Sequence, residues 1–161
     1  MTDIHNMEEP RRFLDWLNSQ GFKVIYLRRK ERFKHAVSLV TSAKVGKLHH
    51  RKKEGHLKRE PVEINPTEVL ETISKFESCY QEEINLLQGI PHLPLIYEEN
   101  LANGEEHQKT ADLVFDYLQL EPEKVKAKLV KIMPQDLAET ILNYEEVVGA
   151  VKQSKYAHIL A

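Results

Sequence analysis

Cysteine is nearly absent from this chain of 161 residues, which contains Cys79 alone. A single cysteine cannot form an internal disulfide, so the composition excludes the class of small domains that disulfides hold together. Long apolar runs are also absent. No stretch approaches the roughly 20 apolar residues that span a bilayer, and the polar N-terminus lacks the apolar core of a signal peptide. We therefore predict a cytoplasmic protein with no membrane association.

A large excess of positive or of negative charge is lacking as well. The 23 basic and 25 acidic residues give a formal net charge of −2 at pH 7, which argues against a dedicated nucleic-acid binder. The content of 41% hydrophobic and 30% charged residues is that of a soluble globular protein. The length fits one domain with a real core, so we predict a single domain over residues 1–161.

The segment from Lys23 to Lys44 predicts a strand, a charged corner and a helix. The apolar run Val24-Ile25-Tyr26-Leu27 is too short for a helix, and Arg28, Arg29 and Lys30 follow it directly. Phe33, Ala36, Val37 and Val40 then recur at helical spacing, which predicts a helix from about 31 to 45. Ligands of open α/β sheets collect where a strand ends and a helix begins, so three cations there indicate an anion site, although most charged corners are only solvated.

The remaining pattern predicts an α/β fold dominated by helices. Asn65 as the N-cap and Pro66 at the first helical position open a helix of about 66 to 88, which serves as the crossover between two parallel strands. Gly21 and Gly89 stand where helices end. The other predicted elements are a helix at about 9 to 19, strands at about 22 to 27 and 93 to 97, and three short helices with apolar faces at Ala111 to Leu118, Val125 to Ile132 and Leu137 to Val148.

Residues 44–60 carry seven Lys or Arg against two Glu, with two glycines and no apolar period. This composition predicts a mobile basic loop. Its histidines, His49, His50 and His56, have neither the i, i+4 spacing nor the finger spacing of a metal site, so we predict no metal. Cys79 lies beside the apolar stripe of the helix at 66 to 88, which indicates a small core residue rather than a nucleophile.

Five segments resemble, in order and spacing, the sulfotransferases that use 3′-phosphoadenosine 5′-phosphosulfate (PAPS). The run from Val24 to Arg29, followed by Ala36-Val37-Ser38, is similar to the family's segment for the 3′-phosphate of the nucleotide. The run from Leu95 to Leu101 is similar to its strand ending in Tyr-Glu-Asp-Leu. Tyr117-Leu118-Gln119-Leu120 is similar to its Phe-Leu-Gly-Leu element, and Asn143 to Val147 resembles the ending of many bacterial members. The resemblance covers nearly the whole chain from about residue 10.

The resemblance implies a site for PAPS or for adenosine 3′,5′-bisphosphate (PAP). In the family an arginine that ends a strand and a serine on the next helix hold the 3′-phosphate, and Ser38 matches the serine. The arginine usually stands eight residues before it, where this chain has Lys30. Arg29 ends the strand and is our first candidate, with Lys30 and Arg28 beside it. The implied fold is a P-loop-NTPase-like, three-layer architecture, here partial and with few parallel strands.

One half of the family's site has no counterpart. These enzymes begin with a strand and a loop of the Pro-Lys-Ser-Gly-Thr type that holds the 5′-phosphosulfate, and the catalytic base commonly lies in the same half. Residues 1 to 23 match none of this. The family's glycine-rich clamp for the nucleotide is also not evident, and Lys152, Lys155 and Tyr156 stand where a substitute for it would lie. The chain therefore resembles a C-terminal portion, with sulfuryl transfer expected only if the other half is supplied, and it leaves the catalytic residues, the acceptor and enzymatic activity itself unassigned.

Two other functions stay open. A non-catalytic helical module of the same fold would bind a partner or a second copy of the chain through exposed strand edges. Nucleic-acid binding through residues 44–60 is the third hypothesis, and the lack of interleaved aromatic residues weighs against it.

Overall fold

The computed structural model describes residues 8–46, 60–127 and 136–160, which fall into two compact units. The first unit takes its residues from Met1–Arg28 and Phe76–Val125, and the second from Arg29–Lys75 and Lys126–Ala161. The boundary between them passes between Arg28 and Arg29 and again within a long helix. The single domain over 1–161 stays a prediction.

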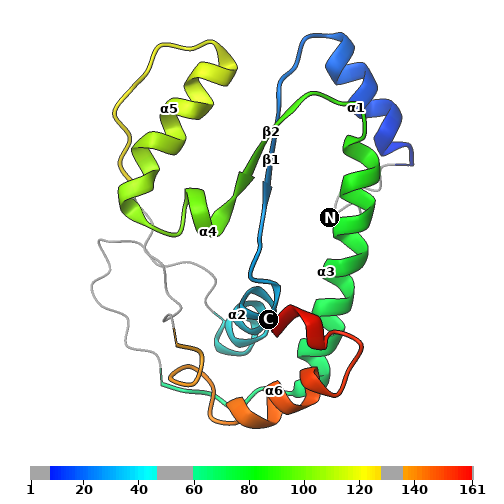
Figure 1. The fold of residues 1–161 in the computed structure, drawn as a ribbon, viewed down its shortest axis with the longest axis vertical. Helices are drawn as coiled ribbons and strands as arrows, with labels where there is room; N and C mark the ends of the chain where they lie inside the picture. The colour runs from blue at the N-terminus through cyan, green and yellow to red at the C-terminus, as the bar shows by residue number, and fades with distance from the viewer. Residues whose placement is uncertain (1–7, 47–59, 128–135, 161) are drawn as a thin grey trace. The chain divides into compact units, whose positions relative to one another are not determined.

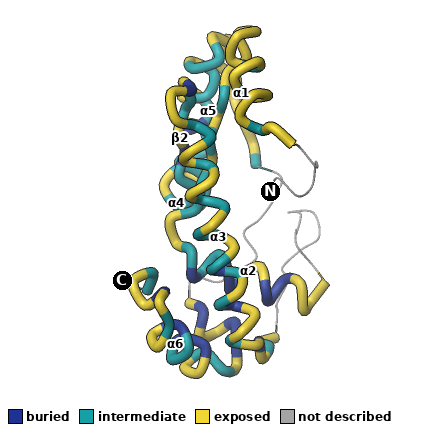
Figure 2. The backbone as a smooth tube through the Cα atoms, turned by 90° about the vertical axis from the view of Figure 1, so that its right-hand side faces the viewer, coloured by how far each residue is buried: buried dark blue, intermediate teal, exposed yellow. Residues whose placement is uncertain are grey.

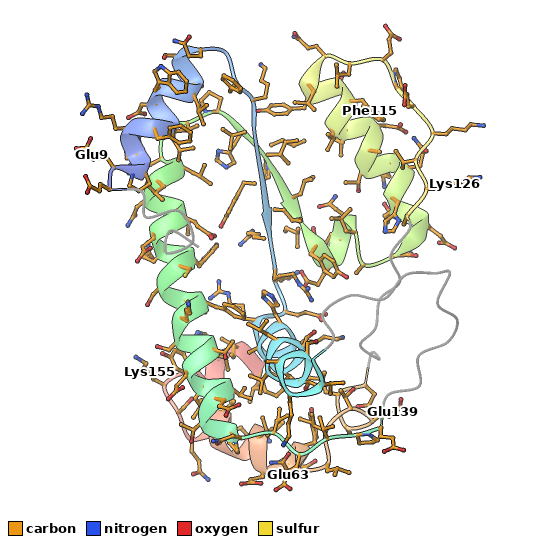
Figure 3. The ribbon with its side chains drawn as sticks, turned by 180° about the vertical axis from the view of Figure 1, so that it is seen from behind. Glu9, Glu63, Phe115, Lys126, Glu139 and Lys155 are labelled. Atoms are coloured by element: carbon orange, nitrogen blue, oxygen red, sulfur yellow. The ribbon has the colours of Figure 1, made fainter. Side chains whose placement is uncertain are left out.

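The first unit contains a parallel pair of strands. Its elements are α1 (Pro10–Ser19), β1 (Val24–Arg28), the second half of α3 (Pro66–Leu87), β2 (His92–Ile96), α4 (Tyr97–Asn100), the 3-10 helix η3 (Gly104–Glu106) and α5 (His107–Leu118). Val24 pairs with His92 and Arg28 with Ile96, so both strands end at the same edge. In Figure 1 the strands lie between α5 and the second half of α3, and Figure 3 shows side chains filling the space between this helix and the strands.

The second unit holds most of the buried apolar residues of the described chain. It contains α2 (Arg32–Val45), the first half of α3, α6 (Tyr144–Lys152) and the 3-10 helix η4 (Ala157–Leu160), which packs against α2. Figure 2 shows this concentration of buried residues in dark blue. Its buried apolar residues are Phe33, Ala36, Val37, Val40, Ile64, Val69, Ile73, Leu137, Ile141, Val147, Val148, Val151 and Tyr156. Each large aliphatic side chain buried here stabilises the unit by about 1.5 to 3 kcal/mol.

The first unit is far less buried. Among its described residues Ile90 and Leu95 are the buried apolar ones, and the stacked aromatic pair of α1, Phe13 and Trp16, is 42% and 53% exposed. The apolar stripe predicted along α3 is buried at Val69 and Ile73, near its start, and Ile84 near its end is 42% exposed. Full burial along α3 is therefore confined to its first half, and the described apolar residues of its second half are half-buried or exposed.

The predicted helix boundaries are confirmed where capping chemistry defined them. The side chain of Asn65 accepts a hydrogen bond from the backbone N–H of Thr67 (2.9 Å), as an N-cap does. Pro66 is the first residue of α3. Gly21 and Gly89 have φ of +80° and +75°, left-handed values that favour glycine after a helix. The helix-dominated α/β class with two parallel strands is confirmed for the described residues.

The C-terminal part differs from the prediction. Residues 125–127 lie in no helix, and residues 128–132 of that predicted helix lie outside the described residues. The face predicted for a helix at 137 to 148 is only half helical, because α6 begins at Tyr144. Ile141 instead forms a parallel bridge with Val62. Leu137, Ile141 and Val148 of the predicted face are buried and Tyr144 is half-buried. A turn followed by a bridge, not a helix, buries Leu137 and Ile141.

Two further predictions concern loops and membranes. Lys44 and Val45 still belong to α2, which ends at Gly46 with φ +71°, and residues 47–59 of the predicted basic loop lie outside the described residues. No helix in the part of the chain that the structure describes is long and apolar enough to cross a bilayer.

Candidate anion site

The two faces of β1 differ in burial. Val24, Tyr26 and Arg28 are half-buried, and Ile25 and Leu27 are exposed. This alternation follows from the two-residue period of a strand. The partners of the half-buried face come from α3, where Tyr80 and Glu83 are three residues apart and so share one side of the helix. The structure thus turns Tyr26 and Arg28 toward α3.

Hydrogen bonds fix both side chains within the first unit. Arg28 Nη1 donates to the Tyr80 hydroxyl oxygen (2.8 Å), and the Tyr26 hydroxyl donates to Glu83 Oε2 (2.8 Å). Burial, together with the adjacent Glu83 carboxylate, raises the pKa of Tyr26 well above its ordinary value of 10.0. Of the four predicted site residues, Arg28 is therefore the one held by the first unit.

The other three, Arg29, Lys30 and Ser38, belong to the second unit. Arg28 is the last residue of β1, so Arg29, which was predicted to end the strand, is instead the first residue after it. Arg29 is half-buried, whereas Lys30 is exposed. The backbone N–H of Arg32 donates to the carbonyl of Lys30 (3.0 Å), which bends the chain into α2. The structure therefore places these two cations in the short turn that leads into the helix carrying Ser38.

Ser38 lies within α2, beside its buried stripe. Its neighbours Val37 and Val40 are buried, Leu39 is exposed and Ser38 is half-buried. The burial of Val37 and Val40 fixes the rotation of α2, and with it the position of Ser38 at the border of the core. Ser38 therefore stands at the border of the core on a helix whose rotation is fixed.

Lys34 is a candidate that the sequence reasoning missed. It precedes Ser38 by four residues, so the two lie on the same side of α2 one turn apart. Its ammonium group forms an ion pair with Glu31 Oε2 (3.2 Å). The four-residue spacing between Lys34 and Ser38 is the signal for this position in the sequence.

The C-terminal residues proposed as a clamp lie in the same unit as α2. Tyr156 is buried, and the Lys155 ammonium stands 5.1 Å from the centre of its ring. Lys152 is the last residue of α6 and is exposed. Both lysines therefore add positive charge to the second unit, next to a 3-10 helix that packs on α2.

The segment after β2 forms a capped turn. Tyr97 to Asn100 form α4, and the Asn100 side chain accepts a hydrogen bond from the backbone N–H of Ile96 (2.7 Å). Buried Thr110 on α5 donates to the carbonyl of Asn100 (2.8 Å). α5 ends at Gln119, a non-glycine residue with φ +60°. These contacts fix the Tyr-Glu-Glu-Asn segment against α5.

Among the residues that the structure describes, no group of three or more His, Cys, Asp or Glu side chains is placed to hold a metal ion. His49, His50 and His56 lie outside it. Cys79 is half-buried.

Comparison with protein-family models, with curated proteins and with solved structures gave no match.

Proposed function

We propose that this chain binds the 3′-phosphate of PAPS or PAP at the turn that leads into α2. Arg29 and Ser38 are the proposed ligands, with Lys30 as the competing cation. A bidentate arginine and a hydroxyl donor suit a phosphate, because charge-assisted hydrogen bonds are strong and directional. The observation that carries the proposal is that Arg29 directly follows a parallel strand while Ser38 stands on the next helix at the border of its core.

Two further features support the sulfotransferase-like, three-layer form of this proposal. β2 leads directly into Tyr97-Glu98-Glu99-Asn100, the segment that resembles the family's Tyr-Glu-Asp-Leu strand end. Gln119 adopts a left-handed conformation at the place where the family's Phe-Leu-Gly-Leu element has glycine. Glycine is the residue that such a conformation favours, so the left-handed backbone at Gln119 supports the resemblance although the side chain differs.

The proposed activity is nucleotide binding. Sulfuryl transfer, like phosphoryl transfer, depends on donors that stabilise charge on the transferred group, and a site for the 3′-phosphate supplies only binding energy. Transfer by this chain would need the 5′-phosphosulfate loop from elsewhere. The acceptor substrate and the catalytic residues are not part of the proposal.

Titration calorimetry with PAP at low salt tests this function. We expect binding by the wild type and a loss of about tenfold or more in affinity for Arg29→Ala and for Ser38→Ala, because each removes a bond to a charged group. Arg12→Ala and Ser78→Ala are matched controls at exposed positions and should bind like the wild type. Absence of binding by the wild type contradicts the proposal.

A second function, self-association through the strands, is favoured by one observation. In the described residues the sheet has two strands, and Ile25 and Leu27 on β1 are 38% and 48% exposed. Parallel sheets usually bury both faces, and two strands seldom suffice for stability. Light scattering tests it: a dimer that Leu27→Lys dissociates supports self-association, and a monomer at all concentrations contradicts it.

A further inference from the structure

Asn103 is followed by Gly104, and no other asparagine of the chain precedes a glycine. In an Asn-Gly pair the backbone nitrogen of the glycine can attack the side-chain carbonyl carbon of the asparagine, because a residue without a Cβ leaves that nitrogen open and lets the backbone turn. The pair lies outside the α-helices, in the bend between α4 and η3, and both residues are exposed. Water therefore reaches the groups that would react.

The fold does not require glycine at position 104. Gly104 lacks the left-handed φ of Gly21 and Gly89, and a Cβ added to it would meet no atom within 4 Å beyond its chain neighbours. The same open space leaves room for the five-membered ring that the attack forms. Alanine thus fits at position 104 without strain, so Gly104→Ala changes the reactivity of the pair and not the fold.

One hydrogen bond holds the Asn103 side chain. Its Oδ1 accepts from the backbone N–H of Glu105 (3.1 Å), as the N-cap of η3. The backbone of Asn103 is extended, with φ −107° and ψ 128°, whereas ring closure needs the nitrogen of Gly104 to turn toward the side-chain carbon. The bond must open before the reaction, and at an exposed position it slows this opening only about twofold to tenfold.

Three other asparagines provide an internal comparison. Asn18 and Asn85 are also exposed, but they lie within α1 and α3, whose regular backbone prevents the turn. Asn65 precedes Pro66, whose nitrogen carries no proton to lose. Exposure alone therefore does not make an asparagine reactive, and Asn103 differs from these three in both its backbone and its neighbour.

We propose that Asn103 is a site of spontaneous deamidation, which its bond to Glu105 slows but does not prevent. The nitrogen of Gly104 loses its proton and bonds to Cγ of Asn103, and the Cγ–Nδ2 bond breaks, so that ammonia leaves and a succinimide remains. Water then opens one of the two C–N bonds of the ring. One opening gives aspartate, and the other gives isoaspartate, in which the chain continues through the side-chain carbon. Either product adds a negative charge beside Glu105.

The two products should differ in their effect on the first unit. The loop is anchored just before Asn103, because Thr110 Oγ1 donates to the carbonyl of Asn100 (2.8 Å) and His107 Nε2 is hydrogen-bonded to the carbonyl of Leu101 (2.9 Å). Aspartate keeps the length of the backbone and the capping oxygen. Isoaspartate adds a methylene to the backbone of this anchored loop, so we expect the isoaspartate form to unfold at lower urea concentration than Asn103→Asp.

Peptide mass spectrometry of the full chain, incubated folded at mildly alkaline pH, tests the proposal. We expect the fragment that contains Asn103 to exchange an amide for a carboxyl group and to become a substrate for an isoaspartate methyltransferase. Fragments that contain Asn18 or Asn85 are the internal controls and should stay unmodified over the same time. Gly104→Ala should slow the reaction about tenfold or more. The chain unfolded in urea should react about twofold to tenfold faster than the folded chain.

Three results would overturn the proposal, and none of them depends on nucleotide binding. The first is modification of Asn103 that does not exceed that of Asn18 in the folded chain. The second is an equal rate in the wild type and in Gly104→Ala, with circular dichroism showing that the variant is folded. The third is a product that contains aspartate without isoaspartate, since direct hydrolysis would then replace the succinimide. Equal rates in the folded and unfolded chain would contradict the protective role of the bond to Glu105.

Discussion

Asn143 clamps the backbone of Ile64 from both sides. Its side-chain oxygen accepts from the N–H of Ile64 (3.1 Å), and its side-chain nitrogen donates to the carbonyl of the same residue (2.8 Å). Ile64 is 2% exposed, and the bridge between Val62 and Ile141 continues this pairing. A single asparagine thus joins segments 79 positions apart and ties the chain before α3 to the start of α6.

Replacing Asn143 by Ala should destabilise the protein by about 2 kcal/mol. Both backbone groups of Ile64 would lose their partners in a place that water reaches poorly. Urea unfolding measures the change. Asn85→Ala, at an exposed position on α3, is the control and should stay within about 0.5 kcal/mol of the wild type. An equal effect of the two substitutions would show that the clamp contributes nothing.

Two buried threonines should respond in opposite directions to the same substitution. The Thr41 hydroxyl has no partner within the described residues although Thr41 is 1% exposed, whereas Thr110, at 4%, donates to the Asn100 carbonyl. Valine keeps the shape and removes the hydroxyl. We expect Thr41→Val to stabilise by about 1 kcal/mol and Thr110→Val to destabilise by about 1 to 2 kcal/mol in urea unfolding. Destabilisation by Thr41→Val would mean that its hydroxyl is paired.

Gln119 and Gln153 both end helices, but with different backbone conformations. Gln119 has φ +60° and Gln153 has φ −83°. Glycine tolerates the left-handed conformation without strain, so Gln119→Gly should stabilise by about 0.5 to 1 kcal/mol. Gln153→Gly should not, because it only adds freedom to the unfolded chain. Thermal unfolding of both variants measures the difference, and stabilisation by Gln153→Gly alone would contradict the argument.

Tyr26 should ionise at higher pH than an ordinary tyrosine. Its pKa is raised from 10.0, first by burial and then by Glu83. The folded state therefore binds the phenol proton more tightly than the unfolded state does, so this contribution to stability is complete below pH 10 and is lost as the pH rises further. The tyrosinate absorbance of the folded protein should show a late ionisation that Tyr26→Phe removes.

The same titration separates the two causes. Glu83→Gln removes the neighbouring charge and should move the late ionisation to lower pH, while burial keeps it above the ordinary value. Glu82→Gln, one residue earlier and exposed, should leave the titration unchanged. If the late ionisation remains in Tyr26→Phe, it belongs to another tyrosine.

Local signals in the sequence predicted α3 and the two strands within one or two residues. α3 has a side-chain N-cap, a proline at its first position and a left-handed glycine beyond its end, and each acts on the backbone nearby. The buried stripe of α2 was also predicted, because its period is a property of one helix. The three candidate cations were predicted at the end of the first strand, and in the structure Arg28 ends β1 while Arg29 and Lys30 follow it.

Long-range contacts could not be predicted in this way. Leu137 and Ile141 have the spacing of a helix. In the structure, however, the backbone at Ile141 pairs with Val62, 79 positions away, and is not helical. The sequence predicted no partner for Tyr80 or Glu83, and the structure makes them the partners of Arg28 and Tyr26. Nothing local in the sequence specifies which helix face meets a strand.

The affinity for PAP compared with its isomer adenosine 2′,5′-bisphosphate, at equal salt, tests the central claim most directly. The two ligands carry the same charge and differ only in the position of one phosphate. A site built from Arg29 and Ser38 for a 3′-phosphate predicts that the wild type prefers PAP about tenfold or more and that Ser38→Ala loses this preference. Equal affinity of the wild type for the two isomers, or binding of neither, would contradict it.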